Sequence, residues 1–305
     1  MPADRPAAGV VLVDKPGGMT SHDVVARARR AFGTRKIGHA GTLDPMATGL
    51  LVLGVEGATR LLTFVVGLDK TYDATIRLGV ATDTDDADGE VTKSRDASSL
   101  ASADILAAIE PLRGHISQVP TRVSAIKVDG RRAYDLARQG IEVELKARDV
   151  TVSRFDVLAE RRPSTGSGTD AWIDLDVVVD CSSGTYIRAL ARDLGAALGV
   201  GGHLTALRRT RIGPFDVVDA APLDALAEAP ALSPADVGAA VLGRLDVDDD
   251  EARDLRHGKR LAGAASRIDG PRAAAVAPDG SLVGIVERRG ADLKSAMNMP
   301  EEQSR

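Results

Sequence analysis

The sequence predicts an α+β protein, in which several strands form a sheet that helices cover. Three observations favour this class. Residues 72–78 alternate between apolar and polar with a period of two, as a half-buried strand does. Residues 24–32 instead carry apolar side chains at helical spacing. The two kinds of stretch do not alternate strictly along the 305 residues, so a regular parallel α/β fold is not expected.

The elements expected in the first two thirds of the chain begin with a buried strand at 10–13. Either Thr20 or Ser21 caps the helix that follows, which runs to Phe32 and is ended by Gly33. The remaining elements expected before residue 200 are strands at 50–55, 72–78, 150–158 and 172–179, a helix at 102–113 with Ser102 as its cap, and a helix at 186–198.

The last third of the chain predicts a second, smaller domain. Its composition turns to Ala, Pro and Leu near residue 220, and the length of the chain favours about two domains. After a helix at 250–257, the apolar stretches 273–277 and 282–286 flank the turn sequence Pro278-Asp279-Gly280, which is typical of a hairpin. We therefore expect one domain at 9–228, a β-rich domain at 243–292 and a disordered tail at 293–305.

Composition restricts where the protein works. A content of 44% apolar residues is enough for a buried core. Cys181 is the single cysteine, which excludes an internal disulfide and fits a reducing compartment. No apolar run reaches the roughly 18 residues of a membrane span, and the first twenty residues carry no signal-peptide core. We expect a soluble, cytoplasmic protein.

The charges are segregated along the chain. The net charge of −5 by itself argues against a nucleic-acid partner. However, residues 24–43 and 200–215 contain several Arg and no acid, whereas acids gather at 83–90 and 246–251. This distribution permits a basic face on an acidic protein. Arginines that only solvate helix surfaces would give the same pattern, so both interpretations stay open.

Several common chemistries are absent from the sequence. The five His and one Cys are scattered, which argues against a zinc site. The acidic stretch 83–90 fails as a calcium loop because Arg95 falls where the bidentate Glu should be, and a solvated acidic turn is favoured. Neither a phosphate-binding glycine motif nor a serine-nucleophile elbow occurs. Carboxylate chemistry without metal or cofactor remains.

Asp44 stands in the densest local group of functional residue types. It precedes Pro45, and an Asp before Pro is most often a helix N-cap with Pro in the first turn. The surrounding glycines, His39 and basic residues also suit a backbone that comes close to a nucleotide while Arg and Lys hold its phosphates. The residues alone favour the capping interpretation and leave the catalytic one open.

The sequence from Gly38 to Gly49, Gly-His-Ala-Gly-Thr-Leu-Asp-Pro-Met-Ala-Thr-Gly, resembles the catalytic motif of the TruB family of tRNA pseudouridine-55 synthases. Seven further segments resemble motifs of that family and follow in its order, over about residues 9–215. They are Asp14-Lys15-Pro16-x-Gly18-Met19-Thr20-Ser21, Asp69-Lys70-Thr71-Tyr72, Asp83-Thr84-Asp85-Asp86-Ala87-Asp88-Gly89, Pro120-x-x-x-Ser124-Ala125-Ile126-Lys127, Tyr134-x-x-Ala137-Arg138-x-Gly140, Cys181-Ser182-x-Gly184-Thr185-Tyr186-Ile187-Arg188 and Leu207-Arg208-Arg209.

The resemblance implies a cofactor-free isomerase that converts uridine 55 in the T-loop of tRNA to pseudouridine after flipping the base. It implies Asp44 as the catalytic carboxylate, either as a nucleophile or as a base that removes a ribose proton. Arg188 would pair with Asp44 and hold its pKa low. Tyr72 would stack on the base and help to remove the C5 proton, and His39 would help to receive the flipped nucleotide.

Supporting roles follow from the same resemblance. Tyr186 and Leu207 would line the pocket, and core packing is nearly as good an account of Leu207. Lys15 would brace the active-site loop, Lys127 would contact RNA or support the pocket, and Asp85 would help to shape RNA docking. The basic segments 27–36 and 208–211 would meet the substrate phosphates.

The implied architecture is a mixed, mainly antiparallel sheet with flanking helices and an active-site cleft, followed by a small PUA-like RNA-binding domain. The implied partner is the T-arm of tRNA, with no protein partner and a monomeric enzyme. Three other hypotheses remain: an RNA-binding folding chaperone, a metabolic enzyme that binds a small phosphate, and a relative that depends on a guide RNA. Asp44 favours the enzyme over the chaperone, and a compact chain without basic extensions favours a stand-alone enzyme over a guide-dependent relative.

Overall fold

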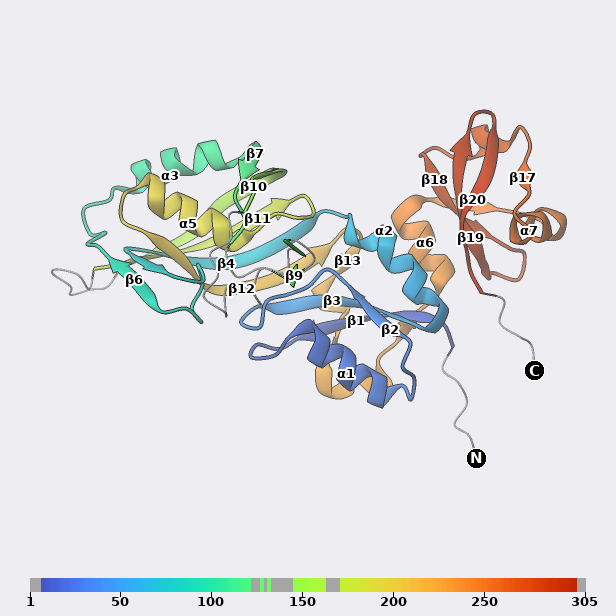
Figure 1. The fold of residues 1–305 in the computed structure, drawn as a ribbon, viewed down its shortest axis with the longest axis horizontal. Helices are drawn as coiled ribbons and strands as arrows, with labels where there is room; N and C mark the ends of the chain where they lie inside the picture. Colours follow the sequence, from blue (N-terminus) through green and yellow to red (C-terminus); the bar gives the residue numbers. More distant parts are fainter. Residues whose placement is uncertain (1–6, 122–126, 129–130, 133–144, 163–170, 301–305) are drawn as a thin grey trace.

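The computed structural model describes residues 7–121, 127–128, 131–132, 145–162 and 171–300, with the backbone alone described for 127–128 and 131–132. Figure 1 shows an elongated molecule. A large sheet occupies one end and the middle, and a compact β-rich domain forms the other end. This arrangement confirms the predicted α+β class.

The large sheet has eleven strands, and its central strands are long. In spatial order they run β14-β1-β3-β12-β4-β11-β10-β7, with β13 beside β12, β15 beside β1 and β2 beside β3. Their bounds are β1 Gly9–Lys15, β2 Ile37–Ala40, β3 Thr48–Val55, β4 Lys70–Leu78, β7 Gly114–Gln118, β10 Arg148–Arg161, β11 Ile173–Cys181, β12 Gly202–Ile212, β13 Phe215–Asp216, β14 Ala221–Pro222 and β15 Ala231–Leu232. The pairs β1–β14 and β3–β12 are parallel and the others antiparallel, which confirms the mixed, mainly antiparallel sheet.

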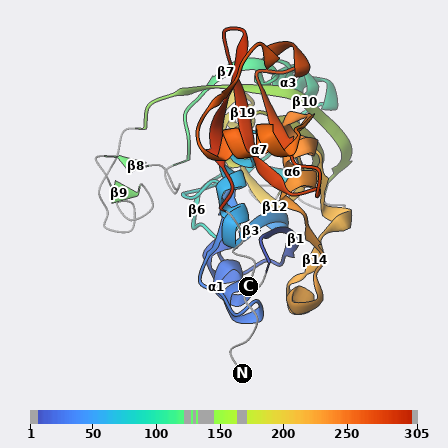
Figure 2. The same cartoon turned by 90° about the vertical axis from the view of Figure 1, so that its right-hand side faces the viewer.

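Helices cover the large sheet on its faces (Figure 1). The α-helices of this part are α1 Ser21–Ala31, α2 Leu62–Val66, α3 Ser102–Ile109 and α5 Ile187–Ala197, and the 3₁₀ turns are Glu56–Leu61, Glu110–Leu112, Val217–Asp219 and Leu223–Glu228. Two short hairpins lie outside the large sheet: β5 Val80–Thr82 with β6 Val91–Ser94, and β8 Lys127–Val128 with β9 Arg131–Arg132. Figure 2 shows β8 and β9 standing out to one side of the sheet.

The C-terminal domain is a five-stranded sheet of order β16-β18-β19-β20-β17. Its strands are β16 Arg244–Asp246, β17 Arg260–Leu261, β18 Arg272–Val276, β19 Leu282–Arg289 and β20 Asp292–Asn298, with helix α7 Asp249–Arg256 and a 3₁₀ turn Ala264–Arg267. Helix α6 Pro234–Leu242 joins the two parts, because its apolar residues belong to a cluster that also contains Val10, Ala274 and Ile285. The chain therefore has one continuous apolar contact between its two sheets.

The predicted elements are largely confirmed, with three differences at their ends. Thr20, not Ser21, caps α1, and it forms a capping box with Asp23. Ser102 is the first residue of α3 and not its cap: its hydroxyl donates to Glu160. The disordered tail expected from residue 293 is wrong up to 298, because these residues form most of β20.

Candidate active site

The loop 41–47 carries Asp44 between β2 and β3. The peptide N–H of Ala47 donates to the carbonyl of Asp44 at 3.1 Å, which makes a single turn, and β3 begins directly afterwards at Thr48. No helix follows Asp44 within 41–47. The helix-capping interpretation is therefore wrong, because a strand and not a helix follows the Asp44 loop.

Buried hydrogen bonds hold this loop in place. The ammonium of Lys15 is fully buried and donates to the carbonyls of Pro16 at 2.9 Å, Met19 at 2.7 Å and Pro45 at 3.3 Å. On the other side, the N–H of Leu43 donates to Ser21 Oγ at 2.9 Å. Both residues that flank Asp44 are thus tied to the segment that leads from β1 into α1. This geometry agrees with the bracing role expected of Lys15.

Arg188 is the centre of the polar contacts around Asp44. Its Nε lies 2.9 Å from Asp44 Oδ2 and its Nη1 lies 3.2 Å from Asp86 Oδ2. Nη1 also donates to the carbonyl of Thr84 at 2.8 Å. The side chain of Arg188 is only 3% exposed, whereas that of Asp44 is 36% exposed. Asp44 therefore combines a buried cationic partner with a surface open to a substrate.

The electrostatic balance at Asp44 differs from the expectation. Burial raises the pKa of the Asp44 carboxyl above its usual value, and the negative charge of Asp86 raises it further. Arg188 and Lys15 oppose this rise by favouring the ionised form. Arg188 does pair with Asp44 as predicted, but the expected low pKa is wrong because desolvation outweighs the pairing.

The acidic loop between β5 and β6 is a part of this site, not a solvated turn. Asp86 is buried, and its Oδ1 accepts hydrogen bonds from Thr84 Oγ1 at 2.5 Å and from the N–H of Asp88 at 3.1 Å. The N–H of Leu204 in β12 donates to the carbonyl of Asp85 at 3.1 Å, which docks the loop on the large sheet. Among these residues, Asp86 is the functional candidate that sequence reasoning missed: its motif was noticed, but its contact with Arg188 was not foreseen.

The start of α5 aims Arg188 at Asp44. Buried Gln118, at the end of β7, donates its amide to the carbonyl of Tyr186 at 3.0 Å and accepts from the Tyr186 N–H at 2.8 Å. Tyr186 is the N-cap of α5, so this double contact fixes the first turn of the helix. Arg188 follows in that turn. The side chain of Tyr186 is half-buried.

Tyr72 and Leu207 come from the two central strands, β4 and β12. In their antiparallel register Leu207 is opposite Ala74 and Arg209 is opposite Tyr72. Both Tyr72 and Leu207 are buried in the cluster that contains Leu43 from the Asp44 loop. Burial raises the pKa of the Tyr72 phenol, and Arg209 opposes the rise by its charge and a hydrogen bond.

Arg209 does not serve as a phosphate contact. It is 1% exposed, and its guanidinium donates to the carbonyls of Leu50 and Gly41, both at 2.9 Å. Its neighbour Arg208 pairs instead with Asp14, through contacts of 3.0 and 2.7 Å. The expectation that segment 208–211 meets phosphates is therefore wrong for Arg209, because that side chain lies inside the protein.

The remaining site candidates are His39 and Lys127. His39 lies in β2, and its ring packs edge-on against that of His22 with centroids 5.4 Å apart. Lys127 lies in β8, and nothing of its side chain is described. The motif segments 122–126 and 133–144 lie outside the described residues.

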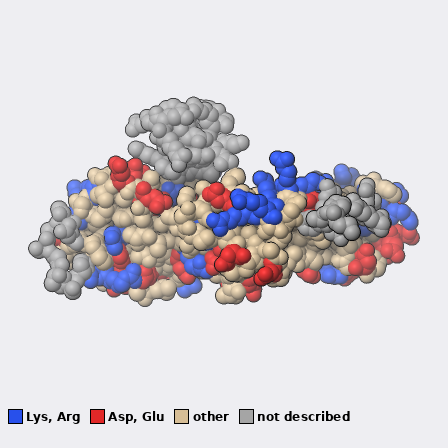
Figure 3. Space-filling view, turned by 90° about the horizontal axis from the view of Figure 1, so that it is seen from below, with Lys and Arg blue, Asp and Glu red and all other residues tan. Residues whose placement is uncertain are grey.

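A basic face lies on and beside α1. Arg27, Arg29 and Arg30 of the helix are exposed, as are Arg35 and Lys36 beyond it. Figure 3 shows Lys and Arg side chains gathered near the middle of this face, with acidic side chains beside them. The basic residues that cluster at 27–36 in the sequence are therefore exposed at the protein surface.

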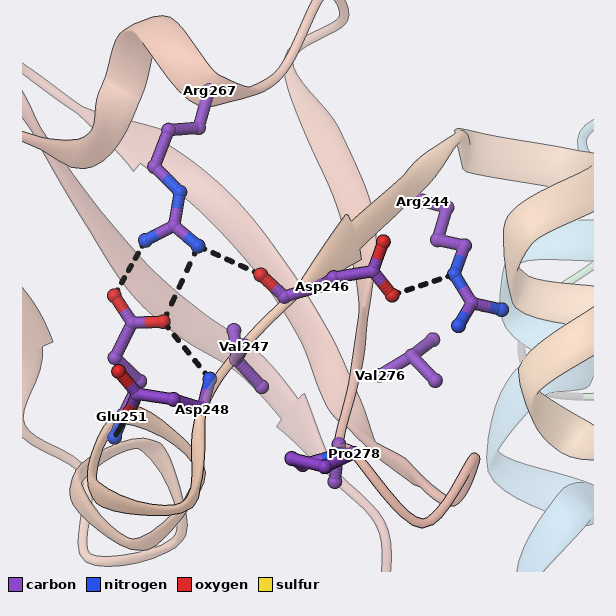
Figure 4. A pocket seen from close by; sticks show the side chains of 9 residues that line it. Arg244, Asp246, Val247, Asp248, Glu251, Arg267, Val276 and Pro278 are labelled. Atoms are coloured by element: carbon purple, nitrogen blue, oxygen red, sulfur yellow. Dashed lines mark hydrogen bonds and ion pairs between the residues drawn. The ribbon is translucent and has the colours of Figure 1, made fainter.

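A separate pocket lies in the C-terminal domain, between β16, the start of α7 and the turn after β18 (Figure 4). Arg267 binds both carboxylate oxygens of Glu251 and the carbonyl of Asp246, and Arg244 pairs with the Asp246 side chain. Asp248 caps α7. These charges satisfy one another, so the pocket offers no reactive group.

Two further features are absent from the described residues. No three or more His, Cys, Asp or Glu side chains are arranged there to hold a metal ion. In the same ranges, no helix has the length and apolarity needed to span a bilayer.

Comparison with protein families accounts for this arrangement. Residues 29–187 match the family described as TruB family pseudouridylate synthase (N terminal domain). Residues 188–244 match the tRNA pseudouridylate synthase B C-terminal domain, and residues 242–300 match tRNA Pseudouridine synthase II, C terminal. The chain belongs to the TruB family. Asp44 lies in the first matched segment and Arg188 is the first residue of the second, so the ion pair joins two matched segments.

Relatives extend over nearly the whole chain. The protein named tRNA pseudouridine synthase B from Leifsonia xyli subsp. xyli is 56% identical over 302 residues, which is 97% of each chain. Proteins of the same name are 58% identical over 281 residues in Mycobacterium sp. (strain KMS), 92% of each chain, and 56% identical over 296 residues in Corynebacterium glutamicum (strain R), 96% of each chain.

Solved structures support the fold. A structure of an H/ACA RNP bound to a substrate RNA containing 2′-deoxyuridine has a TM-score of 0.68 at 24% identity, and the match covers 96% of this chain and 86% of that one. The archaeal box H/ACA sRNP Nop10–Cbf5 complex also gives 0.68 at 24% identity, with 96% and 87% covered. At this identity the likeness concerns the fold alone.

Proposed function

We propose that this chain isomerises a uridine of tRNA to pseudouridine, at position 55 of the T-loop, without a cofactor. The observation that carries the proposal is the Asp44–Arg188 ion pair, in which a partly exposed carboxylate is held by a buried guanidinium. Membership of the TruB family and the full-length relatives named tRNA pseudouridine synthase B support the same reaction.

The chemistry needs one anionic group beside the glycosidic bond. To make pseudouridine, the N1–C1′ bond breaks, the base turns, and a C5–C1′ bond forms. Asp44 would act as a carboxylate in this sequence, either by attack on the nucleotide or by removal of a ribose proton. Arg188 favours that ionised form against the effect of burial, and Asp86 and Thr84 would keep the guanidinium in place.

The pocket for the flipped base would form between the strands that carry Tyr72 and Leu207 and the start of α5 with Tyr186. The first two share one apolar cluster with Leu43, which places them beside the Asp44 loop. Base stacking on an aromatic ring is a usual way to hold an unstacked nucleotide. His39 would contact the incoming nucleotide from β2, and Lys127 would contact the RNA from β8.

The basic face on α1 is the part of the surface best suited to the tRNA backbone. Its exposed residues Arg27, Arg29, Arg30, Arg35 and Lys36 are close in sequence, on and directly after α1. Affinity for tRNA would therefore fall as salt rises.

We further infer a monomer of the cytoplasm with two domains, a catalytic domain at 9–228 and a PUA-like RNA-binding domain at 243–292 extended by β20. A single species of about the monomer mass in light scattering, with and without tRNA, would support the oligomeric state. Deletion of the second domain is not a clean test, because α6 packs against both sheets.

The decisive experiment incubates the protein with an unmodified tRNA transcript, without added metal or cofactor, and maps pseudouridine by position. We expect modification at position 55, none in a transcript with cytidine there, and none with Asp44→Asn. Asp279→Asn is the matched control, since Asp279 lies in the β18–β19 turn, where it accepts a bond from the Ser281 N–H. Full activity of Asp44→Asn would refute the assigned role of Asp44. Binding of tRNA without any modification by the wild type would favour the chaperone hypothesis.

A further inference from the structure

Helix α5 begins without the side-chain cap that usually holds the start of a helix. Its N-cap is Tyr186, whose side chain makes no capping hydrogen bond. The Tyr186 carbonyl accepts the first intrahelical bond, from the Leu190 N–H at 3.2 Å, whereas the Tyr186 N–H precedes the helix and needs a partner elsewhere. Arg188 stands in this first turn, so whatever fixes the turn also fixes the residue that pairs with Asp44.

Gln118 connects this turn to the large sheet. Its side-chain amide donates to the Tyr186 carbonyl at 3.0 Å, and its side-chain oxygen accepts from the Tyr186 N–H at 2.8 Å. Gln118 is only 2% exposed, and the loss of these bonds would leave buried polar groups without partners. One side chain therefore binds the N–H and the carbonyl of the same residue, as a neighbouring strand would.

The large sheet also fixes the position of Gln118 itself. Gln118 is the last residue of β7 and lies opposite Arg148 in the β7–β10 ladder. β10 holds the loop before Tyr186 as well, because the Thr151 N–H donates to Ser182 Oγ at 2.9 Å and the Ser182 N–H donates to the Thr151 carbonyl at 2.8 Å. The start of α5 is thus tied to two adjacent strands.

A second contact joins the end of β7 to α5 further along the helix. Arg192 Nη2 donates to the Val119 carbonyl at 2.7 Å, and Arg192 Nη1 lies 3.4 Å from Asp85 Oδ2 in the acidic loop. Arg192 follows Arg188 by about one helical turn, so both side chains leave the helix on the same face. Attachment at two levels restricts the rotation of α5 about its axis, and this rotation decides whether Arg188 reaches Asp44.

We propose that Gln118 is a positioning residue for the isomerisation: it holds the N–H and the carbonyl of Tyr186 and thereby keeps Arg188 against Asp44. This inference rests on the proposed function. Gln118 touches no reacting atom and acts through Arg188, whose Nε lies 2.9 Å from Asp44 Oδ2. If Gln118 only filled space, an apolar side chain of similar length would replace it without loss of rate.

The first test needs no reaction. The charged or titratable groups that interact with the Asp44 carboxyl are Arg188 of α5, Asp86 of the acidic loop, Lys15 of β1 and Tyr72 of β4. Arg188 favours the ionised form, so a loosened α5 in Gln118→Met should raise the pKa of Asp44. The ¹³Cγ signal of Asp44, assigned by its loss in Asp44→Asn, reports this titration. An unchanged titration in folded Gln118→Met would overturn the proposal.

The second test separates positioning from binding. In Gln118→Met, the plateau rate of single-turnover pseudouridine formation should fall by about 10- to 100-fold with unchanged tRNA affinity, because buried Gln118 does not reach the RNA. The acid limb of the pH–rate profile, where Asp44 becomes ionised, should move to higher pH. Asp86→Asn should move the limb to lower pH, because it removes a charge that raises the pKa of Asp44. A wild-type rate and limb in Gln118→Met would overturn the proposal.

Ser233→Ala is the matched control, because Ser233 also fixes the first turn of a helix. It caps α6, where Ser233 Oγ accepts from the Asp236 N–H at 3.0 Å. This variant should lower the melting temperature and leave both the plateau rate and the acid limb unchanged. An acid limb that moved equally in Ser233→Ala and Gln118→Met would show that the limb reports stability and not position, and would overturn the proposal.

Gln118→Asn and hydrogen exchange cover the case in which Gln118→Met does not fold. The Asn side chain keeps its amide but is one CH₂ group shorter, so the acid limb should move in the same direction by less. In the wild type the Tyr186 N–H should exchange slowly, because Gln118 accepts its hydrogen bond. Fast exchange, or an unchanged limb in Gln118→Asn, would contradict the proposal. If the wild type formed no pseudouridine, the proposed function would fail, and the Asp44 titration and the exchange rate would still decide whether Gln118 positions Arg188.

Discussion

Replacement of Asp86 by asparagine should reveal how much the catalytic carboxylate depends on a second one. Asp86 Oδ2 lies 3.2 Å from Arg188 Nη1. At an effective dielectric constant near 20, this separation corresponds to a gross attraction of about 5 kcal/mol. Because Arg188 keeps its contacts with Asp44 and Thr84, and because the aspartate must also be desolvated, we expect a net loss of about 2–3 kcal/mol in unfolding free energy.

Two further effects of Asp86→Asn would distinguish a role in catalysis from a loss of stability alone. Without the Asp86 carboxylate, the Arg188 guanidinium keeps Asp44 and Thr84 but is held less firmly, so single-turnover pseudouridine formation should slow by about 10- to 100-fold. At the same time, the negative charge that raises the pKa of Asp44 disappears, so that pKa falls. The acid limb of the pH–rate profile should therefore move to lower pH while the plateau rate falls.

Asp174→Asn is the control for this prediction. Asp174 is a similarly buried carboxylate that binds Arg77 through two contacts, of 2.7 and 2.8 Å, away from Asp44. Thermal or urea unfolding should show comparable losses for both variants, whereas the rate and the acid limb should change for Asp86→Asn alone. The reasoning is refuted if Asp86→Asn keeps the wild-type acid limb, or if Asp174→Asn shifts the limb equally.

Three other predictions follow from the same contacts. Lys15→Met should slow single-turnover modification by about 100-fold, because three carbonyls of the loop region lose their donor. Lys70→Met should change the stability with little effect on the rate. Equal rates for the two variants would contradict this. Burial raises the pKa of Asp85 from 3.8 to about 6, so the folded state binds the proton more tightly than the unfolded state does. The free energy of unfolding should therefore fall by up to about 3 kcal/mol as the pH rises from about 4 to about 6. Asp85→Asn should remove that pH dependence in urea unfolding and stabilise the protein at pH 7, helped by the tolerance of Asn for the φ of +62° found there; a loss of stability at pH 7 would contradict it. Gly49→Ala should lower the free energy of unfolding by at least about 3 kcal/mol, because its Cβ would lie 2.2 Å from the Arg209 carbonyl oxygen. Gly199 also has a positive φ but has open space around it, so Gly199→Ala should cost about 1 kcal/mol. Similar urea midpoints for the two variants would exclude this clash.

The fold could be predicted wherever burial and periodicity agree. In β4, buried and less buried residues alternate along Lys70–Leu78, and the sequence shows the same alternation. The strand β12, Gly202–Ile212, was not predicted. The buried residue Arg209 stands where an apolar residue would be expected, so the sequence lacks a clear apolar alternation. β20 was missed for a related reason: of Asp292–Asn298 only Leu293 is buried, so the strand has almost no apolar signal.

The site could be predicted in part. The ordered motifs identified Asp44 and Arg188, and the structure brings both together at 2.9 Å although 144 positions separate them in the numbering (188 − 44). The pKa direction of Asp44 could not be predicted, because it depends on how deeply the loop is desolvated. The part played by Asp86 depends on the docking of its loop against β12, a contact between distant segments.

The buried cations explain why motifs succeeded here where periodicity did not. Inside a protein, a charged side chain must have hydrogen-bond partners, and a backbone carbonyl is a partner that any residue type can supply. Lys15 and Arg209 both end on carbonyls of the segments around Asp44, at Pro45 and Gly41. The partner residues therefore carry no mark of the interaction in their side chains, and no charge pattern can reveal it. What the interaction does require is a fixed backbone path, and the glycines and prolines that produce this path are what the ordered motifs preserve.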